Sequence, residues 1–321
     1  VTDPDAECPA WEAFLESVLP GDLAAHAFLA EWFGYVISGS NDQQKMLSLV
    51  GPPRCGKGTV ARVLSALLGP DVVAAPILDK LGGQFGEQNL IGKKLAIMGD
   101  VRWKSRNAGA AVPVLLMITG DDERDIPRKN QKDWHGRLDV RFVVMSNDVP
   151  EFSDTSGALA DRMMHVEFRT SFLGREDISL RERLLKELPG VLNWSLRGLE
   201  RLRDRGHFAP PESGHELARE VRDGASPISA FLDSEWCVLD PAAESALPDV
   251  ADAYDAWCAG QRRTYDRPPL NALSRNLRNA GRGLSTRRTQ AEGERTQYVV
   301  GLKLARKAGV VATPGQWMIG R

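Results

Sequence analysis

A glycine-rich loop in the first quarter of the chain has the residue types and spacing that hold phosphate. The stretch G-P-P-R-C-G-K-G-T (51–59) directly follows the apolar run M-L-S-L-V. Gly51 and Gly56 allow backbone N–H groups to wrap an anion, and Lys57 places a positive charge near the outer phosphates. The predicted phosphate-binding residues are therefore Gly51, Pro52, Pro53, Arg54, Cys55, Gly56, Lys57, Gly58 and Thr59.

One residue of this loop departs from the usual pattern. Gly58 stands where a Ser or Thr commonly binds Mg²⁺, so the nearest hydroxyl belongs to Thr59. Small nucleotide kinases, signalling switches and motors all use such a loop. The loop alone does not distinguish these classes of protein, so the distinction depends on residues elsewhere in the chain.

A carboxylate suited to holding Mg²⁺ follows the next apolar segment. Asp100 ends the run L-A-I-M-G-D, where a buried strand would bring it beside the phosphates, with Thr59 as a second, less direct Mg²⁺ ligand. An aspartate that only closes a turn is the alternative. Val101 stands where motors often carry a glutamate that polarises water, so no general base is identified.

Two further polar residues follow the third apolar run, V-V-M-S-N. Asn147 is predicted either to orient a water beside the terminal phosphate or to be an ordinary turn residue. Arg162, in A-D-R-M-M-H-V-E-F, is predicted either to stabilise transition-state charge or to pair with Asp161 at the surface. With Lys57 and Asp100, they complete the candidate catalytic set.

The elements that would position these residues alternate between strands and helices. Apolar residues from Trp11 to Ile37 recur at helical spacing, interrupted at Pro20-Gly21-Asp22, with Asp22 as a helix cap. Strands are predicted over 45–50, 94–99 and 139–145, and helices over 58–68 and 112–118. After Arg162 the pattern predicts helices over 180–188, 192–202, 216–221 and 228–236, then 251–258 and 270–279, with β-like runs near 297–302. This alternation predicts an α/β fold with a mostly parallel sheet.

Three regions are predicted from these patterns. A helical segment spans 1–42, the phosphate-binding core with a helical lid spans 43–224, and a basic, winged-helix-like domain spans 225–321. From Gln261 onward the chain has 13 basic and three acidic residues, a net charge of +10 against −12 for the rest. A basic block on an acidic body favours a polyanionic partner, although a solvated surface is the alternative.

Composition limits the remaining possibilities. The chain of 321 residues is 42% hydrophobic and 26% charged, which is typical of a globular protein. No apolar run approaches the ~20 residues that span a bilayer, so no membrane role is expected. The four cysteines form no C-x-x-C pair, which disfavours zinc and disulfides and fits a reducing cytoplasm.

Taken in order, these motifs resemble superfamily 3 DNA helicases, in particular the phage and plasmid primase–helicase group related to the poxvirus primase–helicase. The glycine loop is similar to Walker A, L-A-I-M-G-D to Walker B, and V-V-M-S-N-D-V-P to the sensor motif with Asn147. L-M-I-T-G-D-D-E-R-D-I-P-R-K-N (116–130) resembles the extra motif of this superfamily, and S-G-A-L-A-D-R (156–162) matches the place of its arginine finger. L-A-E-W-F-G-Y-V-I-S-G (29–39) and E-L-P-G-V-L-N-W-S-L-R-G-L (187–199) are similar to flanking segments of that group.

The resemblance implies an AAA+-like ATPase that uses ATP and Mg²⁺ and assembles into a ring, usually a hexamer, on single-stranded or forked DNA. Arg162 would act across the subunit interface. A hairpin over 126–138 would grip the strand through Arg128, Lys129 and Lys132, with Trp134 or His135 near its tip, although a solvated charged hairpin is the alternative. The chain begins with Val, which suggests a fragment with a missing upstream domain; whether that domain is a primase is left open. The bacterial host cytoplasm is the expected location.

The function predicted from the sequence is ATP-dependent translocation or unwinding of DNA in phage or mobile-element replication. A nucleotide kinase would share G-K-G-T but would leave Asn147, Arg162 and the basic hairpin without a role. An ATP-binding replication initiator or ring-assembly factor with weak unwinding is the alternative, because its sequence features would be nearly the same. Gly58 and the missing glutamate after Asp100 predict modest hydrolysis.

Overall fold

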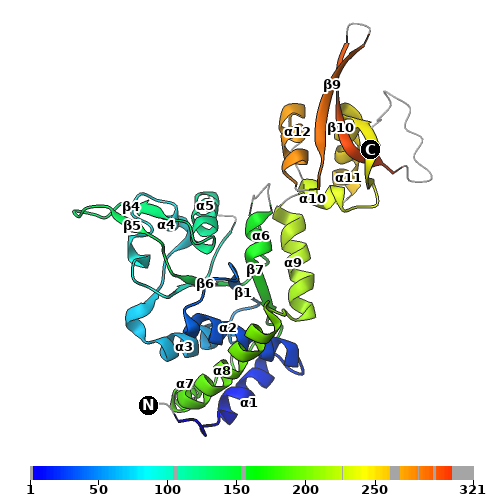
Figure 1. Ribbon diagram of the computed structural model, residues 1–321. Helices are drawn as coiled ribbons and strands as arrows, with labels where there is room; N and C mark the ends of the chain where they lie inside the picture. Colours follow the sequence, from blue (N-terminus) through cyan, green and yellow to red (C-terminus); the bar gives the residue numbers. More distant parts are fainter. Residues whose placement is uncertain are drawn as a thin grey trace. The chain divides into compact units, whose positions relative to one another are not determined.

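The computed structural model describes residues 3–103, 108–152, 157–225, 227–260, 268–280, 282–291 and 294–305 (Figure 1). Contacts between Cα atoms divide the chain into two compact units. The first comprises Val1–Asp154 and Ala158–Ala225, and the second comprises Thr155–Gly157 and Ser226–Arg321. Each unit is described by itself below.

The first unit is built on a five-stranded parallel sheet. Its strands are β1 (Met46–Val50), β2 (Val73–Ala74), β3 (Leu95–Met98), β6 (Arg141–Ser146) and β7 (Met163–Glu167), in the order β2-β3-β6-β1-β7. The strand that follows β1 in the sequence lies at the far edge, so β3 and β6 separate β1 from β2. The chain thus leaves β1 towards one side of the sheet and later returns to its other side as β7. Sheets of this kind bind ligands outside the carboxyl ends of their strands, at the point where the order reverses.

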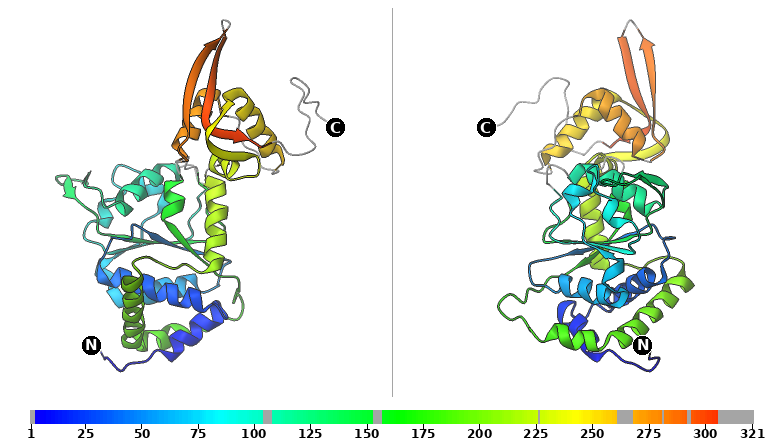
Figure 2. Two further views of the ribbon diagram at one scale, coloured as in Figure 1. Left: turned by 45° about the vertical axis from the view of Figure 1, so that its right-hand side comes forward. Right: turned by 90° about the vertical axis from the view of Figure 1, so that its left-hand side faces the viewer.

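Helices cover both faces of this sheet (Figures 1 and 2). One core cluster joins α1 (Pro9–Val18), α2 (Leu23–Ser38), α3 (Lys57–Leu68) and α8 (Leu188–Arg205) to the face of β1 that carries Leu47 and Leu49. The other joins α4 (Leu78–Leu81), α5 (Ala108–Thr119) and α9 (Glu212–Ala225) to the face that carries Met46. Successive side chains of a strand point to opposite faces, so a run buried on both faces is continuously apolar. The strands predicted before Gly51, Asp100 and Asn147 are confirmed as β1, β3 and β6, and each was predicted from such an apolar run.

The amino-terminal helices confirm the break predicted at Pro20-Gly21-Asp22. The Asp22 carboxylate accepts a hydrogen bond from Ala25 N (2.9 Å) and caps α2, which ends at Gly39 with φ +76°. Capping of this kind is worth about 1 kcal/mol. Glu187 fixes α1 at its start, because its two carboxylate oxygens accept hydrogen bonds from Ala10 N and Trp11 N, each 3.0 Å. The two helices are therefore docked on the same core as the sheet.

A small β-hairpin projects from the first unit (Figure 1). Its strands, β4 (Arg124–Ile126) and β5 (Trp134–Gly136), pair antiparallel, with Ile126 opposite Trp134. Arg124 anchors the hairpin through an ion pair to Glu87 (2.8 Å) in which both side chains are largely buried. Burial raises the pKa of Glu87 against the opposing effect of Arg124. The remaining helices of this unit are α6 (Ala158–Arg162) and α7 (Leu180–Lys186).

In its described residues, the second unit contains three helices and a three-stranded antiparallel sheet. Its elements follow in the order α10 (Pro227–Leu232), β8 (Cys237–Ala246), α11 (Leu247–Gly260), α12 (Leu270–Asn279), β9 (Ser285–Ala291) and β10 (Glu294–Leu304). β10 is the central strand, with β8 and β9 on its two sides. Fourteen buried residues, among them Phe231, Trp257 and Leu277, form a core within this unit.

Two predictions about the carboxyl-terminal half are wrong. The segment directly after Arg162 is the strand β7 and not the beginning of a helical region. The helix predicted over 228–236 ends at Leu232, and β8 begins at Cys237 after a turn. Among the residues that the structure describes, no helix combines the length and apolar character needed to cross a membrane.

Candidate active site

Three sequence motifs meet at the carboxyl edge of the parallel sheet. The glycine loop follows β1, Asn147 follows β6, and Asp100 lies two residues beyond β3. Because β6 lies between β1 and β3, Asn147 stands between the loop and Asp100. Strand order alone therefore brings together residues that are about 45 positions apart along the chain.

Two glycines of the loop are required by its geometry. Gly51 has φ +153°, and a Cβ there would lie 2.1 Å from the Phe168 carbonyl oxygen. Gly56 has φ +104°, and a Cβ there would lie 2.8 Å from Val18 Cγ1 on α1. Both backbone conformations favour glycine, and both sites lack room for a side chain. The loop can therefore pack against Phe168, which follows β7, and against α1. Helix α3 begins directly after the loop glycine, at Lys57.

Lys57 is the buried cation at the centre of this edge. Its Nζ donates to the carbonyl oxygens of Gly51 and Pro52, the latter at 2.9 Å. Nζ also lies 3.3 Å from Cys55 Sγ and 3.3 Å from Asn147 Oδ1. The contact with Asn147 joins the loop to the end of β6. A lysine held this way aims its charge at the space in front of the loop.

Gly58 differs from the two required glycines because it has room for a side chain. The nearest atoms to a Cβ at Gly58 belong to the Arg62 guanidinium, whose Nη1 would be 3.3 Å away. Arg62 Nη2 also donates to Thr59 Oγ1 (3.2 Å). The guanidinium therefore lies over the space that a Ser or Thr side chain at position 58 would enter.

A cavity of about 820 Å³ opens in front of the loop. Its walls are the loop, the end of α1 with Phe14, Ser17 and Val18, the sheet edge with Asp100 and Asn147, and a segment from Phe172 to Arg183. Its lining cations are Arg54, Lys57, Arg62, Arg175 and Arg183, and its lining acids are Asp100, Glu176 and Asp177. Burial, followed by repulsion from Arg181 and Arg54, lowers the pKa of Arg62. This excess of positive charge suits an anionic ligand.

Asp100 occupies an unusual backbone conformation at the cavity wall. Its φ is +47°, and its side chain is exposed. The next residue, Val101, is buried and donates its N–H to the Met145 carbonyl of β6 (2.9 Å). That hydrogen bond ties the end of β3 to β6 and presents the Asp100 carboxylate to the cavity side of the sheet edge.

Arg162 does not join the other three residues within one chain. It precedes Met163, which pairs with Met46, so it lies at the opposite end of the strands from the glycine loop. The length of β1 separates these two edges by about 15 Å. The Arg162 guanidinium donates to the Leu116 carbonyl and to Thr119 Oγ1 (2.7 Å) at the end of α5. Asp161 instead pairs with Arg222 (2.5 Å), so the alternative pairing of Arg162 with Asp161 is wrong.

The predicted DNA-contacting residues lie on the β4–β5 hairpin. Lys129 and Lys132 are exposed, and Arg128 Nε donates to the Lys132 carbonyl (2.7 Å) across the turn. His135 is exposed and bonds Asp125 (2.8 Å) on the paired strand. Trp134 begins β5 directly after the turn, opposite Ile126, where it lies over Gly136 and packs partly buried against the core. The hairpin thus presents cations, with one anchoring aromatic at the turn end of its paired strands.

Several cavity residues have no counterpart among the predictions. Arg62 stands five residues after Lys57 on α3, a place that a helix starting at Lys57 could have suggested. Phe14 and Ser17 come from α1, far upstream, and Phe172, Arg175 and Arg183 come from the segment after β7. No spacing in the sequence marks these residues, because they reach the site only through packing of α1 and α7 beside the loop.

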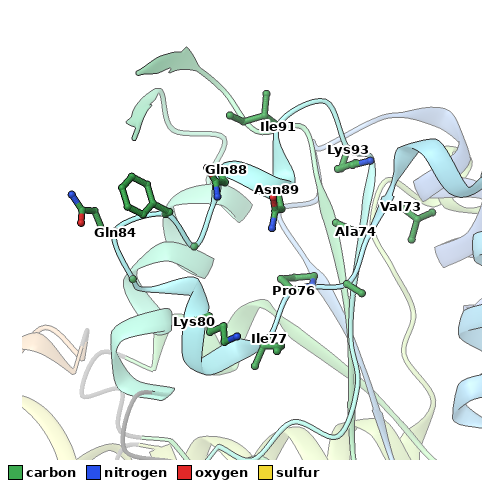
Figure 3. Close-up of a pocket in the computed structure, with 14 residues that line it drawn as sticks. Val73, Ala74, Pro76, Ile77, Lys80, Gln84, Gln88, Asn89, Ile91 and Lys93 are labelled. Carbon is green, nitrogen blue, oxygen red and sulfur yellow. The ribbon is translucent and has the colours of Figure 1, made fainter. Parts of the chain in front are cut away.

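A second hollow of about 930 Å³ lies beside β2, away from the glycine loop (Figure 3). It is lined by the segment 73–93, including Ile77, Lys80, Gln88 and Lys93. Lys93 Nζ donates to the Asp71 carbonyl (2.6 Å). This hollow holds none of the predicted site residues, and no group of three or more His, Cys, Asp or Glu suited to a metal occurs in the described part of the chain.

Comparison with known proteins gives two kinds of likeness. Residues 49–162, from β1 through α6, match the model of a family of unknown function, DUF5906. The apo structure of the NrS-1 C-terminal region (305–718) aligns with a TM-score of 0.60 at 14% identity, covering 94% of this chain and 77% of that one. A second NrS-1 C-terminal region structure, the A form apo structure, gives a TM-score of 0.58 at 14% identity, covering 94% and 78%. At this identity the likeness concerns the fold.

Proposed function

We propose that this chain is an ATP-driven DNA helicase or translocase of superfamily 3, the motor part of a phage or mobile-element primase–helicase. The observation that carries the proposal is the alignment of the glycine loop, Asn147 and Asp100 along one sheet edge, with Lys57 in contact with Asn147. The ordered sequence motifs, from Walker A to the arginine before β7, support the same assignment.

The cavity offers separate surfaces for the two ends of a nucleoside triphosphate. The loop N–H groups and Lys57 would hold the phosphates, with Arg62 as a further cation above Gly58. The apolar wall from Phe14, Val18, Phe172 and Leu180 suits the flat base. ATP is therefore the proposed ligand.

The residues at the cavity mouth fit a Mg²⁺ ion carried by the phosphates. Mg²⁺ in such sites takes one or two protein oxygens and completes its shell with phosphate and water, so a cluster of acids is not needed. Asp100 and Thr59 Oγ1 would hold the ion, which would neutralise charge on the phosphates. Arg62 donates to the same Thr59 oxygen, which leaves a lone pair of that hydroxyl for the metal.

Hydrolysis needs a water placed opposite the leaving group. Asn147 is exposed at the cavity edge and held within 3.3 Å of Lys57, so its amide would orient that water without adding charge. The other two acids of the lining, Glu176 and Asp177, belong to the segment after β7, and Glu176 pairs with Arg54 (3.6 Å). Without a carboxylate directly after Asp100, we expect slow hydrolysis.

Arg162 and the hairpin extend the proposal to an assembly. Because Arg162 lies at the opposite sheet edge from Lys57, it would reach phosphate only on a neighbouring subunit, as an arginine finger in a ring, which we take to be a hexamer. The Lys129 and Lys132 side chains would contact the backbone of a single strand held in that ring. His135 would add a hydrogen bond, and Trp134 would hold the turn end of the hairpin against the core.

Strand displacement on a forked DNA tests the proposal. The full chain, with ATP and Mg²⁺, should separate the fork at a rate that Lys57→Ala removes, and single-stranded DNA should stimulate phosphate release. Nucleotide-dependent DNA binding without displacement would instead favour a replication initiator or ring-assembly factor, a role to which slow hydrolysis also points. Neither displacement nor binding to the fork would remove the DNA motor from consideration.

A further inference from the structure

The hollow beside β2 has the size of a ligand site, and the proposed reaction does not use it. Its volume of about 930 Å³ is similar to the 820 Å³ of the cavity in front of the glycine loop. Both volumes fall within the range of small-molecule sites, roughly 300–1,000 Å³. The two cavities share no lining residue, so the hollow can hold a ligand of its own.

The walls of the hollow expose large apolar side chains. Ile77 is 58% exposed and Phe85 is 38% exposed, although most large apolar side chains of the described residues are buried. Pro76 and Ile91 belong to the same lining (Figure 3). An exposed aromatic ring among aliphatic side chains suits a flat, partly apolar ligand, and a nucleobase is such a ligand because it stacks on aromatic faces.

Amide side chains lie among these apolar residues. Gln84, Gln88 and Asn89 all line the hollow. Figure 3 shows Gln88 and Asn89 on one side of the space in front of Pro76, with Lys80 on the other side. An amide offers a donor and an acceptor together, and the edge of a nucleobase requires this pairing.

The charged residues of the lining are two lysines, without Asp or Glu. The Lys93 ammonium is already engaged, because its Nζ donates to the Asp71 carbonyl (2.6 Å). Lys80 is exposed, and within the described residues it makes no ion pair. Lys80 is therefore the cation that an anionic group in the hollow would meet, and one lysine suits one phosphate group.

We propose that this hollow binds a free nucleotide and is a second nucleotide site, separate from the glycine loop. The base would lie against Phe85 with its edge at Gln88 and Asn89, and the phosphate would meet Lys80. A single DNA strand would need a row of cations along its backbone, which this lining lacks. An acidic peptide would satisfy the lysine but would give no reason for amides beside an exposed aromatic ring.

The wall of this hollow also anchors the β4–β5 hairpin. Gln88 Oε1 accepts a hydrogen bond from Lys129 N (3.2 Å), and Glu87 forms the ion pair with Arg124. In that buried pair, Glu87 Oε2 and Arg124 Nε and Nη1 have no hydrogen-bond partner among the described residues. The anchor is thus incompletely satisfied, and a nucleotide that fixes Gln88 would steady the hairpin.

Fluorescence of 2-aminopurine ribonucleoside monophosphate, titrated with the full chain, tests the site. Stacking on Phe85 should quench the probe, and Phe85→Ala should weaken its binding ~10-fold. Lys57→Ala should leave the affinity within ~2-fold of wild type, because the glycine loop is not involved. No saturable quenching, or quenching that Lys57→Ala removes and Phe85→Ala retains, would overturn the proposal. Tighter, Phe85-dependent binding of a single-stranded DNA hexamer that carries the same base would also overturn it.

Lys80→Ala and Lys93→Ala form the matched comparison. Both remove one lysine from the lining, but the Lys93 ammonium is held by Asp71. Lys80→Ala should weaken probe binding about 5-fold and Lys93→Ala less than ~2-fold, with thermal melting used to confirm that both fold. Equal losses would show unspecific attraction and overturn the site.

Hydrogen exchange measures the link to the hairpin. Saturating probe should slow exchange of the backbone amides over 124–136 several-fold in the wild type and leave it unchanged in Phe85→Ala. Unchanged exchange in the wild type at saturation would overturn the link. Each of these failures leaves the proposed motor standing, because none of the measurements involves ATP hydrolysis.

Discussion

The two edges of the parallel sheet carry different halves of one proposed reaction. The carboxyl edge gathers Lys57, Asn147 and Asp100 around a cationic cavity. The opposite edge holds Arg162 and Lys45 around Asp161 and the end of α5. Burial lowers the pKa of Lys45 against the opposing effect of Asp161, and Arg162 and Arg222 lower it further. Both edges thus concentrate positive charge, and the carboxyl edge lines the cavity in front of the glycine loop.

This difference shows that the fold places Arg162 and the glycine loop at opposite ends of the sheet, so one chain cannot bring them to the same nucleotide. A residue at the start of β7 cannot come near a loop at the end of β1 while both strands remain paired in register from Met46 to Val50. If Arg162 acts on the nucleotide, it acts on that of another subunit, whose carboxyl edge faces it. Substitutions at Lys57 and at Arg162 each weaken one edge while leaving the other intact.

Lys57→Ala should have the largest effect, a loss of ATP hydrolysis to background. Its Nζ is held at the loop by the Gly51 and Pro52 carbonyls, and losing one preorganised charge at a reacting group costs about 10²–10³-fold in rate. Phosphate release measures the effect. Lys93→Ala, in the second hollow, is the matched control and should keep wild-type turnover. Wild-type turnover in the Lys57 variant would exclude the loop from the reaction.

Arg162→Ala should lower turnover by about 10³-fold while nucleotide affinity stays within a few-fold of wild type, because an arginine finger acts mainly on the transition state. Arg219→Ala, an exposed arginine of α9, serves as the control for lost charge. Thermal melting is needed as well, since Arg162 also bonds the end of α5.

Mixing the Lys57→Ala and Arg162→Ala proteins tests whether Arg162 of one subunit acts on the nucleotide bound by another. In a mixed ring, a Lys57 variant supplies its intact Arg162 to the intact loop of an Arg162 variant, so part of the activity should return. If mixing at every ratio leaves activity at the level of the separate variants, the sites are not shared between subunits. Arg162 would then have only a structural role, through its hydrogen bonds to α5.

The sequence was sufficient to place the ends of β1, β3 and β6 at the carboxyl edge, and insufficient for the opposite edge. Apolar runs before Gly51, Asp100 and Asn147 are unambiguous strands, and parallel strands place the residues that follow them at one edge. The run M-M-H-V-E of β7 contains the polar residues His165 and Glu167, so it lacks the continuous apolar character of the other runs. Since β7 was missed, nothing in the sequence placed Arg162 at the opposite edge.

The second unit shows a similar limit. Strand β8 includes Asp240, Pro241 and Glu244 and has no fully buried residue, so no alternation of apolar residues marks it. Its pairing with β10 becomes evident only when both strands are in place. By contrast, α12 was predicted with its observed bounds, because Leu270, Leu273 and Leu277 recur at helical spacing beside exposed arginines.

Lys129→Ala with Lys132→Ala should reduce the ratio of DNA-stimulated to basal hydrolysis by about 10-fold, because two phosphate contacts are lost from the exposed hairpin. The measurement is phosphate release over a titration of single-stranded DNA. Arg137→Ala, whose guanidinium pairs with Asp121 (3.3 Å) near the hairpin base, is the matched control and should change the ratio little. An unchanged ratio in the double variant would show that the strand is gripped elsewhere.

Arg62→Ala should have the smallest effect, a loss of about 5-fold in ATP affinity. A charge-assisted contact to phosphate from a partly exposed arginine is worth about 1 kcal/mol. Arg169→Ala, an exposed arginine paired with Glu167 (2.7 Å), removes the same charge outside the cavity and should leave affinity unchanged.

Gly58→Ser tests whether Arg62 replaces the missing hydroxyl. The serine would enter the space over which Arg62 lies, and its Cβ would be 3.3 Å from Nη1 at the flexible end of that side chain. If Arg62 supplies what the missing hydroxyl would supply, Gly58→Ser should rescue much of the ATP affinity and Mg²⁺ dependence lost in Arg62→Ala. Its effect on the wild-type background should be small. Additive losses in the double variant would mean that the two residues serve unrelated purposes, and that the open space at Gly58 has no part in holding the nucleotide.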